Sequence, residues 1–290
     1  MQSGILVINK EKNMTSRDVV NIACKKLGTK HIGHTGTLDP IATGVLVLGV
    51  NDGCKVIDLL TSVSKVYQAE VIVGLKTDTL DITGTIEEEY NIENLEKEKI
   101  ENTLKTFKGK YLQEVPKYSA IHVNGKRLYE YARENKEVEL PKREVEIFDI
   151  KLLEEIKKEK NYYSFSFIVH VSKGTYIRSL IRDIGSKLGY PCTMKNLIRI
   201  KQGNFSLEEA ISLDDIKEDK IVKIVDALQE YEKLIVDDEV AKKVENGSIL
   251  SFNTNSDMVL ILNQENDLLA IYIRYDKDTS KMKPYKVFRR

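Results

Sequence analysis

The sequence predicts an α+β protein, in which strands and helices share a core without regular alternation. Apolar residues recur with helical spacing in residues 19–27 and 177–188. Residues 66–75 alternate between apolar and polar side chains, and residues 145–153 and 162–171 are typical of a strand pair. These elements do not follow the strand–helix–strand rhythm of a parallel sheet, so a mixed α+β sheet with flanking helices is expected.

The N-terminal region predicts a strand followed by a helix. Residues 4–10 have the composition of a strand, and Thr15 or Ser16 then caps a helix that Gly28 ends. Asp18 lies in the first turn of this helix, where a negative charge complements the helix dipole.

The middle of the chain predicts strands on both sides of a helix. Residues 66–75 form the first strand, and Asn94 is expected to cap a helix that ends near Gly109. Residues 145–153 and 162–171 then predict an antiparallel pair of strands joined by a turn rich in Lys and Glu.

The last third of the chain predicts a helix and then a small β unit. Residues 177–188 predict a helix that Gly189 and Pro191 end. Its apolar side chains face inward, while Arg178 and Arg182 lie four positions apart on a different face. A linker is expected near residues 226–233. Residues 234–290 contain short apolar runs separated by polar turns, as in a small β domain.

Composition limits the class of protein. A chain of 290 residues with 41% hydrophobic residues suffices for one large domain, or for one large and one small domain. Apolar runs long enough for a membrane helix are absent, and the N-terminus lacks the pattern of a signal peptide. Three scattered cysteines fit a reducing cytoplasm, and the four histidines lack metal-ligand spacing. We therefore expect a cytoplasmic protein without a metal.

Charge is balanced overall but separated along the chain. Lys and Arg together number 45, as do Asp and Glu. Residues 171–202 contain seven basic residues and one acid, the last ten residues contain five basic residues, and residues 87–101 contain seven acids. Basic segments that converge on one face bind a phosphate backbone, whereas a single basic run is usually only a solvated face.

One loop concentrates the features of a catalytic site. Residues 33–44 read Gly-His-Thr-Gly-Thr-Leu-Asp-Pro-Ile-Ala-Thr-Gly and precede the apolar run 45–48, which is typical of a buried strand or helix. Three glycines and Pro40 specify the loop backbone around a single carboxylate, Asp39. Such an acid suits a nucleophile or a base, although a helix-capping aspartate in an ordinary loop has the same pattern.

This loop and several later motifs resemble those of the TruB family, the tRNA pseudouridine-55 synthases. The resemblance covers about the first three quarters of the chain, and its strength lies in the order of the motifs. After residues 33–44, the matching segments are Lys65–Tyr67, Tyr118–Ala120, Gly125-Lys126, Tyr129–Arg133, Ser172–Arg178 and Gly203–Phe205.

The resemblance implies a domain organisation and a fold. Residues 1–230 are expected to form a pseudouridine synthase domain with a mainly antiparallel sheet and an inserted thumb at about residues 116–143. That thumb interleaves seven basic residues with three tyrosines and a histidine, which suits loop RNA. A hairpin of helices with its tyrosines packed inward is the structural alternative. Residues 231–290 are expected to form a small β PUA-like domain that binds RNA.

The resemblance also implies roles for individual residues. Asp39 corresponds to the catalytic aspartate and Arg178 to the arginine that pairs with it. Tyr67 corresponds to the tyrosine that stacks on the target uracil or acts as a general base, a choice that the sequence leaves open. His34 occupies the position that stacks within the remodelled T-loop, although a hydrogen bond within its own loop is the alternative. The other implied substrate-binding residues are Tyr176, Leu197, Lys10 and Lys173.

The implied reaction breaks the N1–C1′ bond of uridine and joins C5 to C1′, so it needs no cofactor or metal. The expected partner is the T-stem-loop of tRNA, with the target uridine flipped out and the enzyme a monomer. The sequence departs from the family pattern at Asn13 and Asn135, which replace glycines. Asn is the non-glycine residue that best tolerates a positive φ, so the turn at Asn13 is expected to survive.

Three other functions compete with this interpretation. A guide-RNA-dependent pseudouridine synthase shares the aspartate motif but usually has a longer PUA domain and an N-terminal extension, which this chain is expected to lack. An RNA-binding protein that helps tRNA to fold would not need Asp39 for catalysis. A phosphoryl-transfer enzyme using Asp78 or Asp81 has no phosphate-binding loop nearby.

Overall fold

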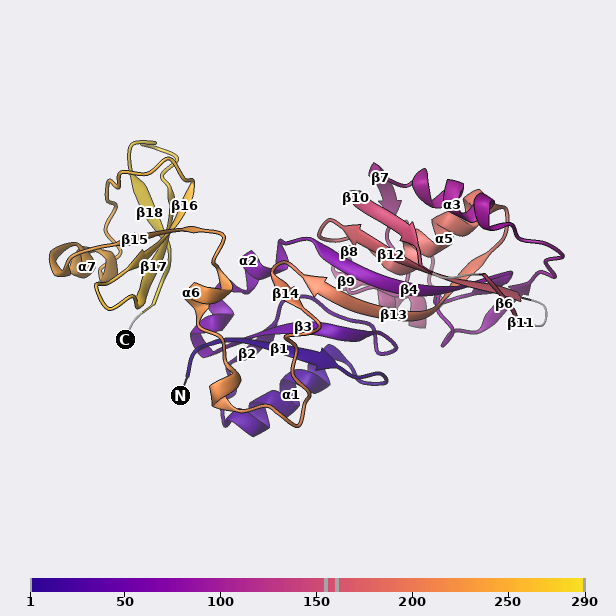
Figure 1. Ribbon diagram of the computed structural model, residues 1–290, viewed down its shortest axis with the longest axis horizontal. Helices are drawn as coiled ribbons and strands as arrows, with labels where there is room; N and C mark the ends of the chain where they lie inside the picture. Colours follow the sequence, from indigo (N-terminus) through magenta and orange to yellow (C-terminus); the bar gives the residue numbers. More distant parts are fainter. Residues whose placement is uncertain (1, 154–155, 160–161, 289–290) are drawn as a thin grey trace.

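The computed structural model describes residues 2–153, 156–159 and 162–288. A large sheet dominates it (Figure 1). The strands of this sheet are β1 (Gly4–Lys10), β2 (Ile32–His34), β3 (Thr43–Val50), β4 (Lys65–Val73), β7 (Gly109–Glu114), β10 (Lys142–Leu152), β11 (Lys157–Glu159), β12 (Tyr162–Val171), β13 (Cys192–Gln202) and β14 (Phe205–Ser206). Their main order is β1-β3-β13-β4-β12-β10-β7. Neighbouring strands are antiparallel except β3 and β13, so the expected α+β class with a mainly antiparallel sheet is confirmed.

Helices pack against both faces of this sheet, because one apolar cluster joins residues 16–27 and 177–188 to Leu46 and Leu48, and another joins residues 51–61 to Val45 and Val47. These helices are α1 (Ser16–Leu27), the 3₁₀ helix η1 (Asn51–Val56), α2 (Ile57–Thr61), α3 (Lys97–Lys105) and α5 (Ile177–Leu188). In Figure 1, α3 and α5 lie together on one side of the β4-β12-β10 region. Leu180 and Ile184 of α5 are fully buried in the same core as Phe165 and Phe167 of β12, which is why this helix has its apolar stripe.

The predicted ends of two helices are confirmed. Thr15 caps α1, because its Oγ1 accepts a hydrogen bond from the Asp18 N–H at 3.1 Å. The Asp18 carboxylate in turn accepts from the Thr15 N–H at 2.8 Å. Gly28 ends α1 and Gly189 ends α5, both in the left-handed conformation that glycine adopts without strain.

The predicted start of α3 is wrong. This helix begins at Lys97 after Glu96, and Asn94 does not cap it. Ile92 and Leu95 are buried in the core from the irregular segment before the helix, so the apolar pattern starts earlier than the helix does. The expected Lys- and Glu-rich turn after β10 lies partly outside the described residues.

Residues 116–143, the expected thumb, contain a small β-hairpin followed by one short helix, so the alternative of a helical hairpin is wrong. Their elements are β8 (His122–Val123), β9 (Lys126–Arg127) and α4 (Leu128–Arg133). Asn124 and Gly125 form the turn with φ of 50° and 84°, which matches the two-residue hairpin turns that favour Asn-Gly. A second short hairpin, β5 (Leu75–Thr77) with β6 (Ile86–Glu89), holds the segment that contains Asp78 and Asp81.

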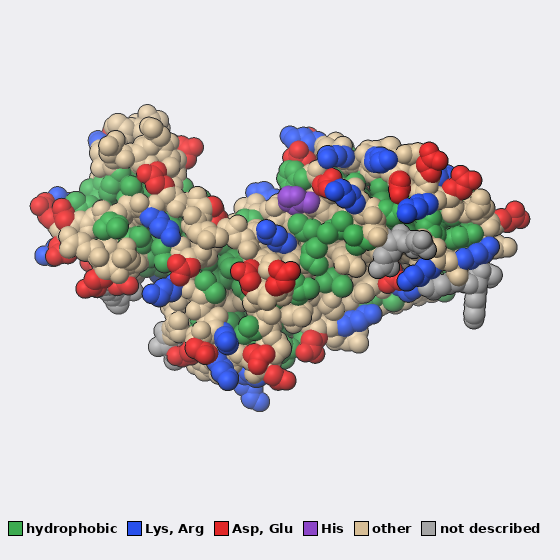
Figure 2. Space-filling view, viewed as in Figure 1, with side chains coloured by type: hydrophobic (Ala, Val, Ile, Leu, Met, Phe, Trp, Pro, Cys, Tyr) green, Lys and Arg blue, Asp and Glu red, His purple; other side chains and the backbone are tan. Residues whose placement is uncertain are grey.

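The C-terminal residues form a separate small sheet, as the apolar runs predict. Its order is β15-β16-β17-β18, and it lies at one end of the molecule (Figure 1). The elements of this region are η2 (Glu218–Lys220), α6 (Ile224–Ala227), β15 (Glu232–Ile235), α7 (Asp238–Glu245), β16 (Met258–Leu262), β17 (Leu268–Arg274) and β18 (Met282–Val287). Figure 2 shows a notch between this unit and the rest of the molecule.

The two sheets share a buried contact. Leu260, Ile271 and Phe288 of the C-terminal unit belong to one apolar cluster with Val47 of β3 and Leu228. Leu228 is fully buried, so the connection near residues 226–233 is packed against the core. Arg289 and Arg290 of the basic C-terminal run lie outside the described residues. Within the described part of the chain, none of the helices is long and apolar enough to cross a membrane.

Candidate active site

The loop between β2 and β3 holds Asp39 in a defined position. The Leu38 N–H donates to Ser16 Oγ at 2.9 Å and the Thr35 N–H to the Val47 carbonyl at 3.0 Å. The Pro40 carbonyl accepts from the Asn13 N–H at 2.8 Å. Asn13 has a φ of 67°, so the expected tolerance of this turn for asparagine is confirmed. The loop is thus tied to α1 and β3 on either side of the carboxylate.

Gly44 closes the loop where the chain enters β3. Its φ is 99°, and a Cβ built there would lie 2.3 Å from the Arg199 carbonyl oxygen. β3 and β13 pair in parallel at this point, with Gly44 opposite Arg199. Only glycine allows the two backbones to approach so closely, and this contact brings β13 alongside the Asp39 loop.

Arg178 forms the predicted ion pair with Asp39. Its Nε donates to one carboxylate oxygen at 2.9 Å and its Nη2 to the other at 3.0 Å, a bidentate arrangement. The guanidinium also donates to the carbonyls of Thr79 at 3.1 Å and Tyr118 at 3.0 Å. The Arg178 side chain is 7% exposed and the Asp39 side chain 33% exposed, so the arginine is buried while the carboxylate still faces the cavity.

The Asp39 carboxylate opens into a cavity of about 880 Å³. Its floor includes Tyr67 of β4 and Leu197 of β13, which are buried, and Tyr176 lies at its edge before α5. Five basic side chains but only two acids, Asp39 and Glu144, line this cavity. The basic side chains are Lys65, Arg143, Lys173, Arg178 and Arg199. The cavity therefore combines one oriented carboxylate, aromatic and aliphatic surfaces, and a positive potential.

Comparison with known proteins identifies the family. Residues 24–177 match the family described as "TruB family pseudouridylate synthase (N terminal domain)", and residues 178–238 match the "tRNA pseudouridylate synthase B C-terminal domain". The chain is 43% identical over 302 aligned positions to a protein of Bacillus subtilis (strain 168) named "tRNA pseudouridine synthase B". That alignment covers 99% of this chain and 98% of its relative. The chain belongs to the TruB family of pseudouridine synthases. It is therefore an isomerase.

Other relatives agree in sequence and in fold. A Staphylococcus saprophyticus protein with the same name is 38% identical, with 99% of this chain and all of the relative covered. Two solved structures share the fold of this chain at lower identity: an H/ACA RNP bound to a substrate RNA containing 2′-deoxyuridine and a Cbf5-Nop10-Gar1 complex. Their TM-scores are 0.72 and 0.71, at 22% and 24% identity. Each alignment covers 99% of this chain. The two alignments cover 85% and 84% of the solved chains, respectively.

The sequence did not predict Lys65 and Arg199 as site residues, although both line the cavity. Lys65 is buried and donates to the carbonyls of Thr61 and Val63, and burial, together with Arg199 and Lys173, lowers the pKa of Lys65 to about 8. Arg199 is 1% exposed and donates to the Val45 carbonyl at 2.7 Å. Each lies two residues from an expected site residue on the same strand, so the strand period places both on the cavity face.

Two of the expected substrate-binding residues do not line the cavity. Lys10 is fully buried, and its ammonium donates to the carbonyls of Glu11, Met14 and, at 3.4 Å, Pro40. A lysine held in this way supports the Asp39 loop from behind, so this geometry does not support direct contact with substrate. His34 accepts a hydrogen bond from the Gly36 N–H at 3.3 Å through Nδ1, as the alternative of a bond within its own loop expects. Burial lowers the pKa of His34, and Arg17 and Arg199 lower it further.

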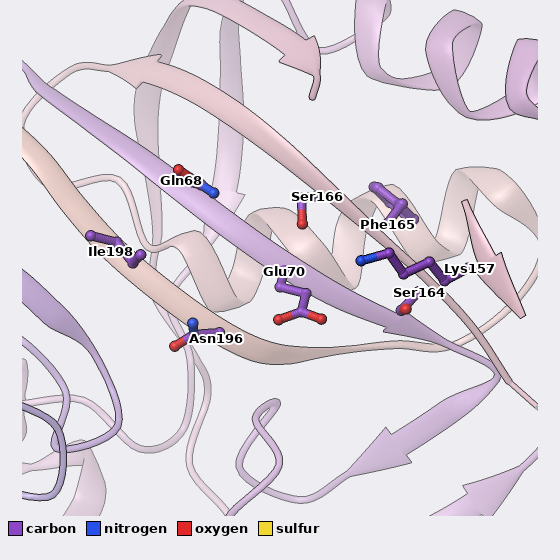
Figure 3. Close-up of a pocket in the computed structure, with 8 residues that line it drawn as sticks. All are labelled: Gln68, Glu70, Lys157, Ser164, Phe165, Ser166, Asn196 and Ile198. Atoms are coloured by element: carbon purple, nitrogen blue, oxygen red, sulfur yellow. The ribbon is translucent and has the colours of Figure 1, made fainter. Parts of the chain in front are cut away.

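The basic run 171–202 reaches the cavity only in part. Lys173, Arg178 and Arg199 line it, whereas Lys195 pairs with Glu70 on the opposite face of the sheet at 2.9 Å. A second cavity of about 170 Å³ lies on that face, between strands β4, β12 and β13 (Figure 3). It is lined mainly by polar side chains, and it contains none of the predicted site residues.

Proposed function

We propose that this TruB-family enzyme converts uridine 55 in the T-loop of tRNA to pseudouridine, with Asp39 as the catalytic carboxylate. The observation that carries the proposal is the bidentate Asp39–Arg178 pair at the wall of a cavity large enough for a flipped nucleotide. The names of the relatives support tRNA as the substrate.

The chemistry needs a carboxylate beside the sugar and the base. The N1–C1′ bond breaks, the uracil turns over, and C5 bonds to C1′; the C5 proton leaves and N1 gains a proton, so the atoms balance. Asp39 either adds to C1′ or assists proton loss towards a glycal intermediate, and both routes need the ionised acid. The Arg178 guanidinium favours the ionised carboxylate and fixes the direction of its two oxygens.

Tyr67 is proposed to stack on the uracil or to remove its C5 proton. Its ring lines the cavity with Leu197, which suits the face of a base. A Tyr67→Phe variant distinguishes the two roles, because phenylalanine retains the stacking surface and loses only the hydroxyl. Near-normal turnover would exclude Tyr67 as the base.

Binding is proposed to depend on the basic side chains of the cavity and on two further surfaces. Extruding a uridine costs a few kcal/mol, which stacking and phosphate contacts must offset. The thumb, residues 116–143, and the small unit at residues 231–290 are the proposed additional RNA contacts, within a synthase domain of residues 1–230. In the thumb, the guanidinium groups of Arg127 and Arg133 lie over the Tyr129 ring at 5.8 and 5.3 Å. The proposal is for a monomeric cytoplasmic enzyme that needs no guide RNA, cofactor or metal.

The test is tritium release from tRNA transcripts labelled at uracil C5, using the purified protein alone in the presence of a chelator. We expect release with the unaltered protein and loss of at least about 10³-fold in rate with Asp39→Asn. A transcript lacking the T-loop uridine should give no release from that site. Tight tRNA binding without release would favour the RNA-folding function, or a requirement for a guide RNA.

A further inference from the structure

Gln113 of the edge strand β7 is a buried polar residue outside the cavity wall. It is 0% exposed, and its side-chain amide meets both backbone polar groups of Tyr176. The Tyr176 N–H donates to Gln113 Oε1 at 2.8 Å, and Gln113 Nε2 donates to the Tyr176 carbonyl at 3.2 Å. Nε2 also donates to the Tyr111 hydroxyl at 2.5 Å. Hydrogen bonds to its oxygen and from its nitrogen thus fix the orientation of the Gln113 amide.

Tyr176 is the residue that caps α5, and its own side chain makes no capping hydrogen bond. Its carbonyl accepts the first bond of the helix, from the Leu180 N–H at 3.0 Å. The N–H groups at a helix start lack partners within the helix, and an unpaired buried donor is costly. Gln113 supplies the missing partner from another strand, so it acts as an external cap that sets where α5 begins.

The strand next to β7, β10, contacts the ring of Tyr176. Arg143 of β10 lies directly opposite Gln113 in the antiparallel register, so the two side chains share one face. The Arg143 guanidinium lies 5.6 Å from the centre of the Tyr176 ring. The first turn of α5 is also tied to β7 by Ser179 Oγ, which donates to the Glu114 carbonyl at 2.8 Å.

We infer that Gln113 is a positioning residue for Arg178, and through Arg178 for the Asp39 carboxylate. Arg178 follows Tyr176 by two residues, so any shift of the cap moves the base of the arginine side chain. A bidentate pair tolerates little displacement, and misplacement of a reacting group by about 1 Å costs on the order of 10²-fold in rate. The inference rests on the proposed function of Asp39 and adds a residue that does not touch the substrate.

The test compares Gln113→Leu with Thr193→Val. Thr193 is an equally buried side chain that donates to a backbone carbonyl, that of Leu75 at 2.8 Å, away from the cavity. We expect Gln113→Leu to lower the single-turnover rate on the order of 10²-fold with little change in the Kd for tRNA. Thr193→Val should lose stability and keep the rate, when both are measured below the Tm of each variant.

A second variant adds a pH readout that a merely structural role would not move. Gln113→Glu keeps the acceptor for the Tyr176 N–H and regains a donor only when protonated. Burial raises the pKa of such a carboxyl group, and the Arg143 guanidinium on the same face opposes that rise. The rate of Gln113→Glu relative to the unaltered protein should rise as the pH falls and the carboxyl group gains its proton. A rate equal to that of the unaltered protein at every pH would contradict the inference.

A spectroscopic readout separates this inference from the proposed function. The Arg178 Nε–H resonance, assigned by its loss in Arg178→Lys, should exchange faster with solvent in Gln113→Leu than in Thr193→Val. If the unaltered protein releases no tritium but this difference appears, the proposed function fails and the positioning role stands. Equal exchange together with an unchanged rate would overturn the positioning role.

Discussion

The Asp39 site and the thumb place charged groups in opposite ways. At the site, Arg178 is 7% exposed and makes four hydrogen bonds to three segments that lie far apart in the sequence. In the thumb, Glu134 pairs with Lys126 at 2.9 Å and Lys136 at 2.8 Å, with all three side chains at least 40% exposed. Buried charges whose hydrogen bonds are all formed fix the positions of their partners. Exposed ion pairs contribute little to stability and rearrange easily. The fixed charges are thus concentrated around Asp39, and the exposed ones lie in residues 116–143.

Replacing Arg178 tests the buried side of this contrast and should have the largest effect after that of Asp39→Asn. Arg178→Lys keeps the charge but loses the planar fork that meets both Asp39 oxygens. We expect the isomerisation rate to fall about 10²–10³-fold. Single-turnover tritium release measures the rate, and circular dichroism verifies folding. A rate close to that of the unaltered protein would mean that charge alone suffices.

Gly44→Ala tests the close approach of Gly44 to the Arg199 backbone, which holds β3 and β13 together beside the Asp39 loop. Gly109 provides the control, because its φ of 103° resembles the 99° of Gly44 but a Cβ there meets no atom within 4 Å. Both substitutions strain the backbone, and only Gly44→Ala also collides with Arg199. We expect Gly44→Ala to cost about 1–3 kcal/mol more of the free energy of unfolding in urea. Equal losses would show that β3 and β13 can separate at no cost.

The pH dependence of tRNA binding tests the buried charge of Lys65. Because the pKa of Lys65 is about 8, its positive charge is lost as the pH rises through that value, and tRNA affinity should fall between about pH 7 and 9. Lys65→Met should bind more weakly at pH 7 and lose most of this dependence. In Lys173→Met, which removes an exposed cation of the same cavity, the dependence should persist.

The pH dependence that Lys65 gives to stability has the opposite sign to the one that it gives to tRNA binding. The folded pKa of Lys65 lies below its ordinary value of 10.5, so the unfolded chain binds more protons between those two values. The contribution of Lys65 to the free energy of unfolding therefore rises with pH over that interval. Urea unfolding of the unaltered protein and of Lys65→Met measures this contribution. The two pH values are 7.5, which lies roughly half a unit below the interval, and 9.5, which lies well within it.

The thumb should show the smallest response. Glu134→Gln removes an exposed acid between two lysines, so we expect an unchanged Tm and slightly tighter tRNA binding from the more positive hairpin. Thermal unfolding and a filter-binding titration measure the two quantities. A clear loss of Tm in Glu134→Gln would show that the exposed ion pairs do stabilise the thumb.

Local patterns in the sequence predict the local parts of this structure. Thr15, Gly28 and Gly189 mark helix ends because capping depends on neighbouring residues alone. The family resemblance led to the Asp39–Arg178 pair. The burial of Lys10 and Arg199 was not predictable, because it depends on which strands become neighbours. The Asn124-Gly125 turn is a local signal of the thumb hairpin that our sequence interpretation did not use.

The distance along the chain between Asp39 and Arg178 has a consequence for synthesis. The two residues are 139 positions apart, and β13, which lies against the Asp39 loop at Gly44, comes later still. During translation the carboxylate therefore leaves the ribosome well before its partner arginine and the strand that packs beside it. Such long-range pairing forms late and slowly. A nascent chain that ends before β13 therefore lacks Leu197 and Arg199 of the cavity and the strand that packs beside the Asp39 loop.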